Sequence, residues 1–193
     1  MILRSDAQAN HGRIVAAATD AFGEKGLAAD MKEIADRAGV AVGTLYRHFP
    51  GKEEMLTAIL REAIAGKLAG IDAAEAIADP LAALRFLLTH EYARVERYGW
   101  LTEATVSGQL PPACTASLHA DVQRLDYAGR FERLIERGVR AGQLRADLDV
   151  RAAAAMLGGT AMPWNYRRFA QHSTPAQVAE AVLATFLRGG GAD

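Results

Sequence analysis

Residues 30–49 read DMKEIADRAGVAVGTLYRHF and predict two short helices joined by a tight turn. Asp30 and Glu33 form a variant of the capping box, in which Asp30 accepts amide hydrogen bonds and Glu33 reaches back. Gly39 can take the positive φ that a sharp corner between helices requires. The helices expected at 31–38 and 42–49 would lock together through small and apolar side chains: Ile34, Ala35, Val40, Leu45 and Phe49. This pattern is typical of a helix-turn-helix, whose second helix enters the major groove of DNA.

The expected second helix has two distinct faces in a helical projection. Leu45 and Phe49 point inward, so Gly43 and Arg47 lie on the outward face. The flanks, which would border the phosphates of the groove, carry Thr44, His48, Tyr46 and, at the start of the next helix, Lys52. The charged side chains between residues 37 and 52 are cationic: Arg37, Arg47 and Lys52. The stretch is therefore locally basic, although the net charge of the chain is −1.

Residues 13–56 resemble the DNA-binding domain of the TetR family of regulators. The matching pattern is Arg13-Ile14, Ala17-Ala18, Phe22, Gly26, Ile34-Ala35, Ala38-Gly39-Val40, Gly43-Thr44-Leu45-Tyr46, His48-Phe49, Lys52 and Leu56. The resemblance implies that backbone contacts come from Thr44, Tyr46, His48 and Lys52, and base contacts from residues 41–43. The full set of predicted DNA-binding residues is Lys32, Ala41, Val42, Gly43, Thr44, Tyr46, Arg47, His48 and Lys52.

Two features depart from what DNA binding usually requires. Residues 41–43 offer no side-chain hydrogen bond, so readout there is apolar, for example against thymine methyl groups. Arg47 is then the best candidate for a hydrogen bond to a base, with a phosphate contact as the alternative. The N-terminal arm carries only Arg4 before His11 and Arg13, which is sparse for an arm that grips DNA. Plain helix packing could also explain the glycine turn, but it leaves the outward Arg47 and its polar flanks unexplained.

The apolar spacing is helical almost throughout the 193 residues, with no sustained strand pattern of period two. We expect an all-α fold of about nine helices, near 7–25, 31–38, 42–49, 52–77, 81–97, 99–108, 113–142, 150–171 and 175–188. Pro163 is expected to kink the helix at 150–171. Residues 1–56 should form the helix-turn-helix domain, and residues 57–193 a helical domain for ligand binding and dimerisation.

Composition excludes several other classes of protein. No stretch approaches the apolar run of a membrane-spanning helix, and residues 1–6 lack the apolar core of a secretory signal. Cys114 is the one cysteine, so an internal disulfide is impossible, which fits the cytoplasm. An inert buried thiol is a simpler interpretation of Cys114 than a redox sensor. The sequence shows no zinc-binding pattern, and we expect neither a metal nor a cofactor.

The TetR resemblance implies that the C-terminal part is a helical bundle that binds a small inducer and dimerises through its last two long helices. Small residues at 152–155 and 158–159 would let another helix approach closely, and the final helix has an apolar side. We expect the dimer interface to include Met156, Gly159, Val182 and Phe186. An intramolecular core is the alternative. A dimer is favoured because its two-fold symmetry suits the reading of a palindrome.

Glu91 lies within an apolar face of the helix expected at 81–97, where a carboxylate without a partner is costly. One interpretation makes Glu91 a ligand-orienting group in a cavity that includes Tyr92, Trp100, Tyr127 or Trp164. The other pairs it with an arginine of a neighbouring helix. The cavity would lie between the helix that begins at Lys52 and the helices near 81–108 and 113–142. It would suit a ligand with an apolar body and one cationic or hydrogen-bond-donating group.

Together these features predict a ligand-responsive transcription regulator, most simply a repressor of an adjacent operon. Its expected partners are double-stranded DNA with a palindromic operator, a small-molecule inducer that releases it, and a second copy of the chain. We expect it in the cytoplasm, without a membrane partner. Two other classes stay open: an all-α enzyme or carrier, and a structural DNA-binding dimer without an inducer. Against an enzyme, no nucleophile–base pair, metal cluster or phosphate loop stands out in the sequence.

Overall fold

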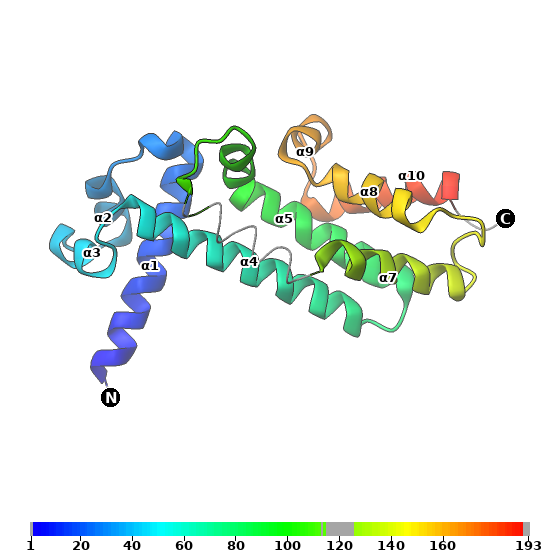
Figure 1. Ribbon diagram of the computed structural model, residues 1–193, viewed down its shortest axis with the longest axis horizontal. Helices are drawn as coiled ribbons and strands as arrows, with labels where there is room; N and C mark the ends of the chain where they lie inside the picture. The colour runs from blue at the N-terminus through cyan, green and yellow to red at the C-terminus, as the bar shows by residue number, and fades with distance from the viewer. Residues whose placement is uncertain (1, 113, 115–125, 191–193) are drawn as a thin grey trace. The chain divides into compact units, whose positions relative to one another are not determined.

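The structure is a computed structural model that describes residues 2–112, 114 and 126–190 (Figure 1). Within these ranges the chain forms nine α-helices, one short 3-10 helix and no β-strand, which confirms the expected all-α fold. In the same ranges, no helix combines the length and apolar character needed to cross a membrane. The helices belong to two compact units, which are described separately below.

The first unit comprises residues up to 64 and a second segment that begins at Arg97. Its elements are α1 (Ile2–Lys25), η1 (Gly26–Ala28), α2 (Met31–Ala38), α3 (Val42–His48), the start of α4 (Lys52–Ala76) and the end of α5 (Pro80–Val106). Figure 1 shows α2 and α3 as two short helices beside the long α1. The core joins them through fully buried side chains, including Ile14, Phe22, Ile34, Leu45, Met55 and Ile59.

Local signals in the sequence set the bounds of α2 and α3. The Asp30 carboxylate accepts a hydrogen bond from the backbone N–H of Lys32 at 2.9 Å, so it caps α2 as expected. Gly39 ends α2 in the left-handed region with φ of 64°. The expectation that Glu33 completes the capping box is not met. Glu33 bonds Lys25 at 2.7 Å and Arg37 at 2.9 Å instead, because both cations lie within reach of its carboxylate.

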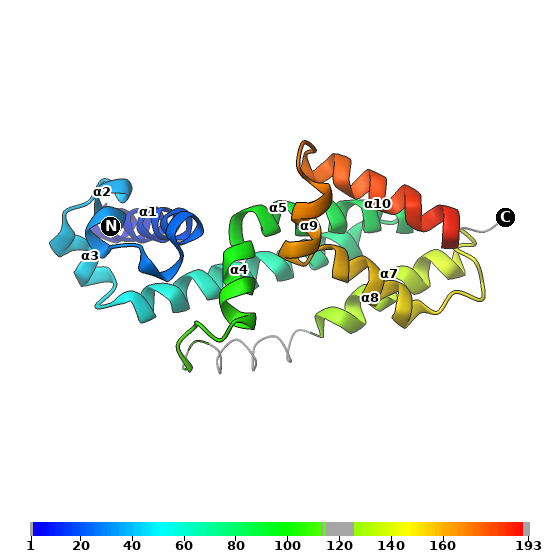
Figure 2. The same cartoon turned by 90° about the horizontal axis from the view of Figure 1, so that it is seen from above.

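The second unit comprises residues 65–96 and the described residues from 126 onward. Its elements are the rest of α4, most of α5, and then α7 (Tyr127–Arg140), α8 (Val150–Thr160), α9 (Pro163–Phe169) and α10 (Pro175–Gly190). Figure 2 shows α7 and α8 running beside each other, and α7 turns its apolar face inward. The core is built from buried side chains of these helices, including Leu84, Leu87, Leu88, Tyr92, Leu134, Ile135, Leu157 and Leu183.

Two helix boundaries were predicted wrongly. The segments expected at 81–97 and 99–108 form the single helix α5, which runs through Gly99. A glycine inside a helix costs about 1 kcal/mol, and the burial of Gly99 and of Leu101 beside it offsets this cost. The helix expected at 150–171 is not kinked at Pro163 but divided there. α8 ends at Thr160, and Pro163 occupies the first turn of α9, where its missing N–H costs nothing.

α1 begins at Ile2, five residues before the start expected at residue 7, and ends at Lys25 as expected. The remaining expectations agree with the structure or lie partly outside it. α4 and α10 begin at Lys52 and Pro175, and each ends within two residues of the expected position. The helix expected at 113–142 is seen as α7 over Tyr127–Arg140, and residues 113 and 115–125 lie outside the described residues. Asp149 caps α8 by accepting a hydrogen bond from the N–H of Ala152 at 3.0 Å.

Candidate functional site

The helix α3 presents one buried and one open face. Leu45 and Phe49 are buried, so they anchor α3 in the core of the first unit. The opposite face is exposed at Gly43 and Arg47, as the helical projection predicts. The other predicted DNA-binding residues are exposed at Lys32, Ala41 and Tyr46, and half-buried at Val42, Thr44, His48 and Lys52. The open face is therefore held rigidly by its buried counterpart.

Two of the predicted DNA-binding side chains contact each other on α3. The Arg47 guanidinium donates a hydrogen bond from Nη2 to Oγ1 of Thr44, one turn earlier, at 2.9 Å. Arg47 is otherwise a long side chain with much rotamer freedom, which binding would have to restrict. The Thr44 hydroxyl thus orients the guanidinium on the exposed face before any partner arrives.

The local positive charge is smaller than the sequence suggests. Arg37 bonds Glu24 through both terminal nitrogens, at 2.8 and 2.5 Å, and also bonds Glu33. Arg37 therefore holds the helices α1 and α2 together rather than adding a free cation to the surface. Lys52 donates a hydrogen bond from Nζ to the backbone oxygen of Leu27 at 3.2 Å. This bond ties the start of α4 to η1.

His11 is a neighbour of the predicted DNA-binding surface that the sequence analysis did not assign to it. Its ring lies 4.9 Å from the ring of Phe49 and 6.1 Å from that of His48, measured between centroids. His11 comes from α1, whereas His48 ends α3. Because the contact joins two helices far apart in sequence, no spacing within one helix could have revealed it.

In the second unit, the structure brings together two of the five predicted pocket residues, Glu91 and Tyr127. The Glu91 side chain is 13% exposed, and its Oε2 lies 3.5 Å from Nζ of Lys67 on α4. The same ammonium group lies 4.1 Å from the centroid of the Tyr127 ring. Burial, and then the negative charge of Glu91, raises the pKa of the Tyr127 hydroxyl well above its ordinary value. A partly buried cluster of Lys67, Glu91 and Tyr127 therefore joins α4, α5 and α7.

The other three predicted pocket residues do not join this cluster. Tyr92 is fully buried, stacks on Tyr166 at 5.3 Å and hydrogen-bonds the Thr160 hydroxyl at 2.6 Å. Trp100 packs on Phe22 within the first unit, with ring centroids 5.5 Å apart. Trp164 is 47% exposed on α9. Tyr92 and Trp100 thus serve their cores, and Trp164 faces outward.

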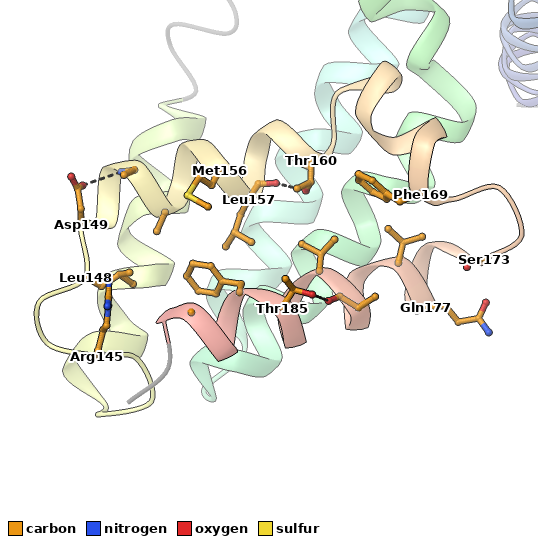
Figure 3. Close-up of a pocket in the computed structure, with 17 residues that line it drawn as sticks. Arg145, Leu148, Asp149, Met156, Leu157, Thr160, Phe169, Ser173, Gln177 and Thr185 are labelled. Atoms are coloured by element: carbon orange, nitrogen blue, oxygen red, sulfur yellow. Dashed lines mark hydrogen bonds between the residues drawn. The ribbon is translucent and has the colours of Figure 1, made fainter. Parts of the chain in front are cut away.

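An apolar groove of about 650 Å³ runs between α8 and α10 (Figure 3). Three of the four predicted dimer residues line it: Met156, Val182 and Phe186. Met156 is 68% exposed, which is unusual for a methionine beside other apolar side chains. The fourth, Gly159, is half-buried on α8 and is not part of the lining. The groove leaves apolar surface uncovered in a single chain.

Comparison with known proteins identifies the family. Residues 14–59 match the model described as "Bacterial regulatory proteins, tetR family". The HTH-type transcriptional repressor KstR2 of Rhodococcus jostii is 32% identical over 146 residues, which cover 72% of this chain and 70% of that protein. The chain belongs to the TetR family. As a TetR-family member it is a helix-turn-helix DNA-binding regulator of transcription, in agreement with the sequence analysis.

Two further comparisons bear on the extent of the TetR-family likeness. The HTH-type transcriptional repressor KstR of Mycobacterium tuberculosis is 34% identical over 137 residues, or 69% of this chain, but the match spans 59% of that protein. The solved structure of the ketosteroid transcriptional regulator KstR2 of Mycobacterium tuberculosis superposes with a TM-score of 0.72 at 26% identity and covers 95% of each chain. The likeness in fold therefore extends through both units.

Proposed function

We propose that this TetR-family regulator is a repressor that binds a palindromic operator as a homodimer and leaves it when a small molecule binds. The observation that carries the proposal is the open face of α3, where Arg47 is oriented by Thr44 above the buried Leu45 and Phe49. A rigid helix with an exposed, preoriented arginine suits the major groove, where a guanidinium can donate two hydrogen bonds to guanine.

In this proposal the residues of the surface have separate roles. Arg47 reads a base, and residues 41–43 contact thymine methyl groups or allow a close approach of the backbone. Phosphate contacts come from Tyr46, His48, Lys32 and Lys52. Thr44 either orients Arg47 or contacts a phosphate as well. Such backbone contacts position the helix without carrying sequence information. All of these residues lie in the helix-turn-helix domain expected at residues 1–56. In this proposal, ligand binding and dimerisation belong to the domain expected at residues 57–193.

The groove between α8 and α10 supports the homodimer. A second copy related by two-fold symmetry would cover the apolar lining with the same surface of its own chain. Burial of apolar surface contributes about 25 cal/mol per Å², so an exposed lining of this kind favours association. The same symmetry axis would pair two α3 helices for the two halves of a palindrome.

The repressor role rests on the names of the relatives, KstR and KstR2, which are transcriptional repressors. Because these relatives are regulators of transcription, we assign this chain no enzymatic activity. The buried cluster around Glu91 and Tyr127 supports a ligand site in the second unit, since a buried carboxylate needs polar partners. Chromosomal DNA as the target implies action in the cytoplasm.

A mobility-shift titration with the DNA upstream of the neighbouring gene tests the proposal. We expect a sequence-specific complex whose affinity falls steeply with salt, because phosphate contacts release counterions. Transcription from the same fragment in a purified system should fall when the protein is added. The repressor assignment would be contradicted if unlabelled unrelated DNA displaced the protein as readily as the unlabelled upstream fragment does, or if transcription rose when the protein was added.

A further inference from the structure

The Glu91 carboxylate is incompletely satisfied. Its Oε1 atom is buried and accepts no hydrogen bond from any residue that the structure describes. A buried acceptor left unpaired carries a free-energy cost, and the cost is larger when the acceptor is charged. Most buried polar side-chain atoms in native proteins have a hydrogen-bond partner, which can be a protein group, a water molecule or another bound group. The free lone pairs of Oε1 therefore mark a place where a hydrogen-bond donor is favoured.

The cations around Glu91 lie beyond good hydrogen-bond distance. Lys67 Nζ is 3.5 Å from Oε2, and Arg94 Nε is 3.9 Å from Oε1. By contrast, Arg85 approaches Glu180 at 2.6 Å in an exposed pair of the same unit. The Glu91 side chain is less exposed than that of Glu180, yet its distances to the cations are longer. The cations therefore lie near the carboxylate without forming a close hydrogen bond to it.

The charges of the cluster restrict the kind of group that can bind at Oε1. A cationic group would meet the repulsion of Lys67 and Arg94, and an anionic group at this atom would meet that of Glu91 itself. A neutral hydroxyl avoids both, since it can donate its proton to Oε1 and accept a hydrogen bond from a neighbouring ammonium or guanidinium group. Apolar side chains flank the site on α5, with Leu88 one turn before Glu91 and Val95 one turn after.

We infer that the ligand of the second unit carries a neutral hydroxyl group that donates to Glu91 Oε1, on an otherwise apolar body. This inference rests on the proposed ligand-responsive function and narrows its ligand class. The sequence analysis allowed either a cationic or a hydrogen-bond-donating group on the ligand, and this inference excludes the cationic group.

Three probes with the same eight-carbon chain test the inference: octan-1-ol, octanoate and octylamine. Each is titrated calorimetrically into the full-length protein at neutral pH. Octan-1-ol should bind at least about tenfold more tightly than the other two, in line with one hydrogen bond to a charged acceptor. Glu91→Met should weaken octan-1-ol binding about tenfold or more. Glu91→Gln, whose amide oxygen still accepts, should weaken it about threefold to tenfold, and decides the matter if Glu91→Met does not fold.

Glu180→Gln is the matched control, because Glu180 also pairs with an α5 arginine but is exposed. It should leave octan-1-ol binding unchanged. Tighter binding of octanoate or octylamine, no binding of octan-1-ol, or octan-1-ol binding that both Glu91 variants leave intact would overturn the inference. Operator affinity is measured separately with and without octan-1-ol. Octan-1-ol that binds at Glu91 but leaves operator affinity unchanged contradicts ligand-driven release, whereas a failed probe series with intact operator binding contradicts the inference alone.

Discussion

Arg47 donates a hydrogen bond to the Thr44 hydroxyl at 2.9 Å, one turn earlier on the exposed face of α3. The bond orients a cation on the surface that we propose binds DNA. Because Arg47 makes no ion pair with a carboxylate among the described residues, its charge stays available for a base or a phosphate.

The first prediction concerns base readout by Arg47. Arg47→Ala should reduce discrimination at one or two base positions by about 1–3 kcal/mol, the range for a good bidentate contact. Arg47→Lys, which keeps the charge but loses the fork geometry, should lose most of the same discrimination. Binding to a panel of single-base operator variants measures this. An equal loss of affinity for every duplex in the panel would instead assign Arg47 to a contact with the DNA phosphates.

The second prediction concerns Tyr46, which is 47% exposed beside Arg47. Tyr46→Phe removes only the hydroxyl, so it should weaken operator and unrelated DNA by similar factors, since a phosphate contact carries no sequence information. Fluorescence anisotropy with both duplexes at one salt concentration compares the two. A selective loss on the operator would assign the hydroxyl to a base.

The third prediction concerns pH. The hydrogen bond from Arg37 lowers the pKa of Glu24, and hydrogen bonds from Lys25 and then Arg37 lower the pKa of Glu33 below its ordinary value of 4.5. A carboxyl group with a lower pKa in the folded state stabilises the fold above its unfolded pKa, and this contribution disappears as the pH falls through the folded pKa. Between about pH 5 and pH 3, the melting temperature of Arg37→Met should therefore fall less than that of the wild type.

The control for this pH effect is Arg188→Met, which removes an exposed arginine from the end of α10. Its melting temperature should follow the wild-type slope. Parallel slopes for wild type and Arg37→Met would show that the ion pairs of Arg37 with Glu24 and Glu33 contribute nothing measurable to stability, which is true of many exposed ion pairs.

The fourth prediction concerns assembly. Val182→Glu combined with Phe186→Glu places two charges in the groove between α8 and α10, where burial would be costly. Light scattering should then give the mass of one 20.6 kDa chain, whereas the wild type should give that of two. Operator affinity should fall about a hundredfold, because the two half-sites are no longer bound by linked modules.

Arg188→Glu serves as the control for the groove, since Arg188 is exposed on the same helix outside the lining. It should remain dimeric. A wild-type protein that is monomeric at micromolar concentration would contradict the assembly proposal. The double variant should keep the helical circular dichroism spectrum of the wild type, which shows that the loss of the dimer is not caused by unfolding.

The parts of the fold that sequence predicts well are those set by neighbouring residues. Asp30 and Gly39 fix the two ends of α2 through a cap and a left-handed turn, so these bounds could be predicted to the residue. Gly99 and Pro163 show the opposite case. Whether a glycine interrupts a helix, or a proline kinks or starts one, depends on tertiary burial that no local pattern contains.

The same distinction holds for the candidate sites. The outward face of α3 follows from helical periodicity alone, because Leu45 and Phe49 mark the buried side. Arg37 and Glu91 each have one charged partner on their own helix and one on another helix, Glu24 and Lys67 respectively. Spacing within one helix indicates the first kind of partner, but no local pattern identifies the second. Lys67 meets Glu91 only through the packing of α4 on α5 in the second unit.

The most direct test of the central claim is selection of bound duplexes from a random-sequence pool by the full-length protein. Sequence-specific binding by two symmetry-related α3 helices predicts enrichment of a palindrome, and Arg47→Ala should enrich a sequence relaxed at the position that Arg47 reads. Selection that enriches no two-fold symmetric sequence, with equal affinity for the starting pool, would contradict the account.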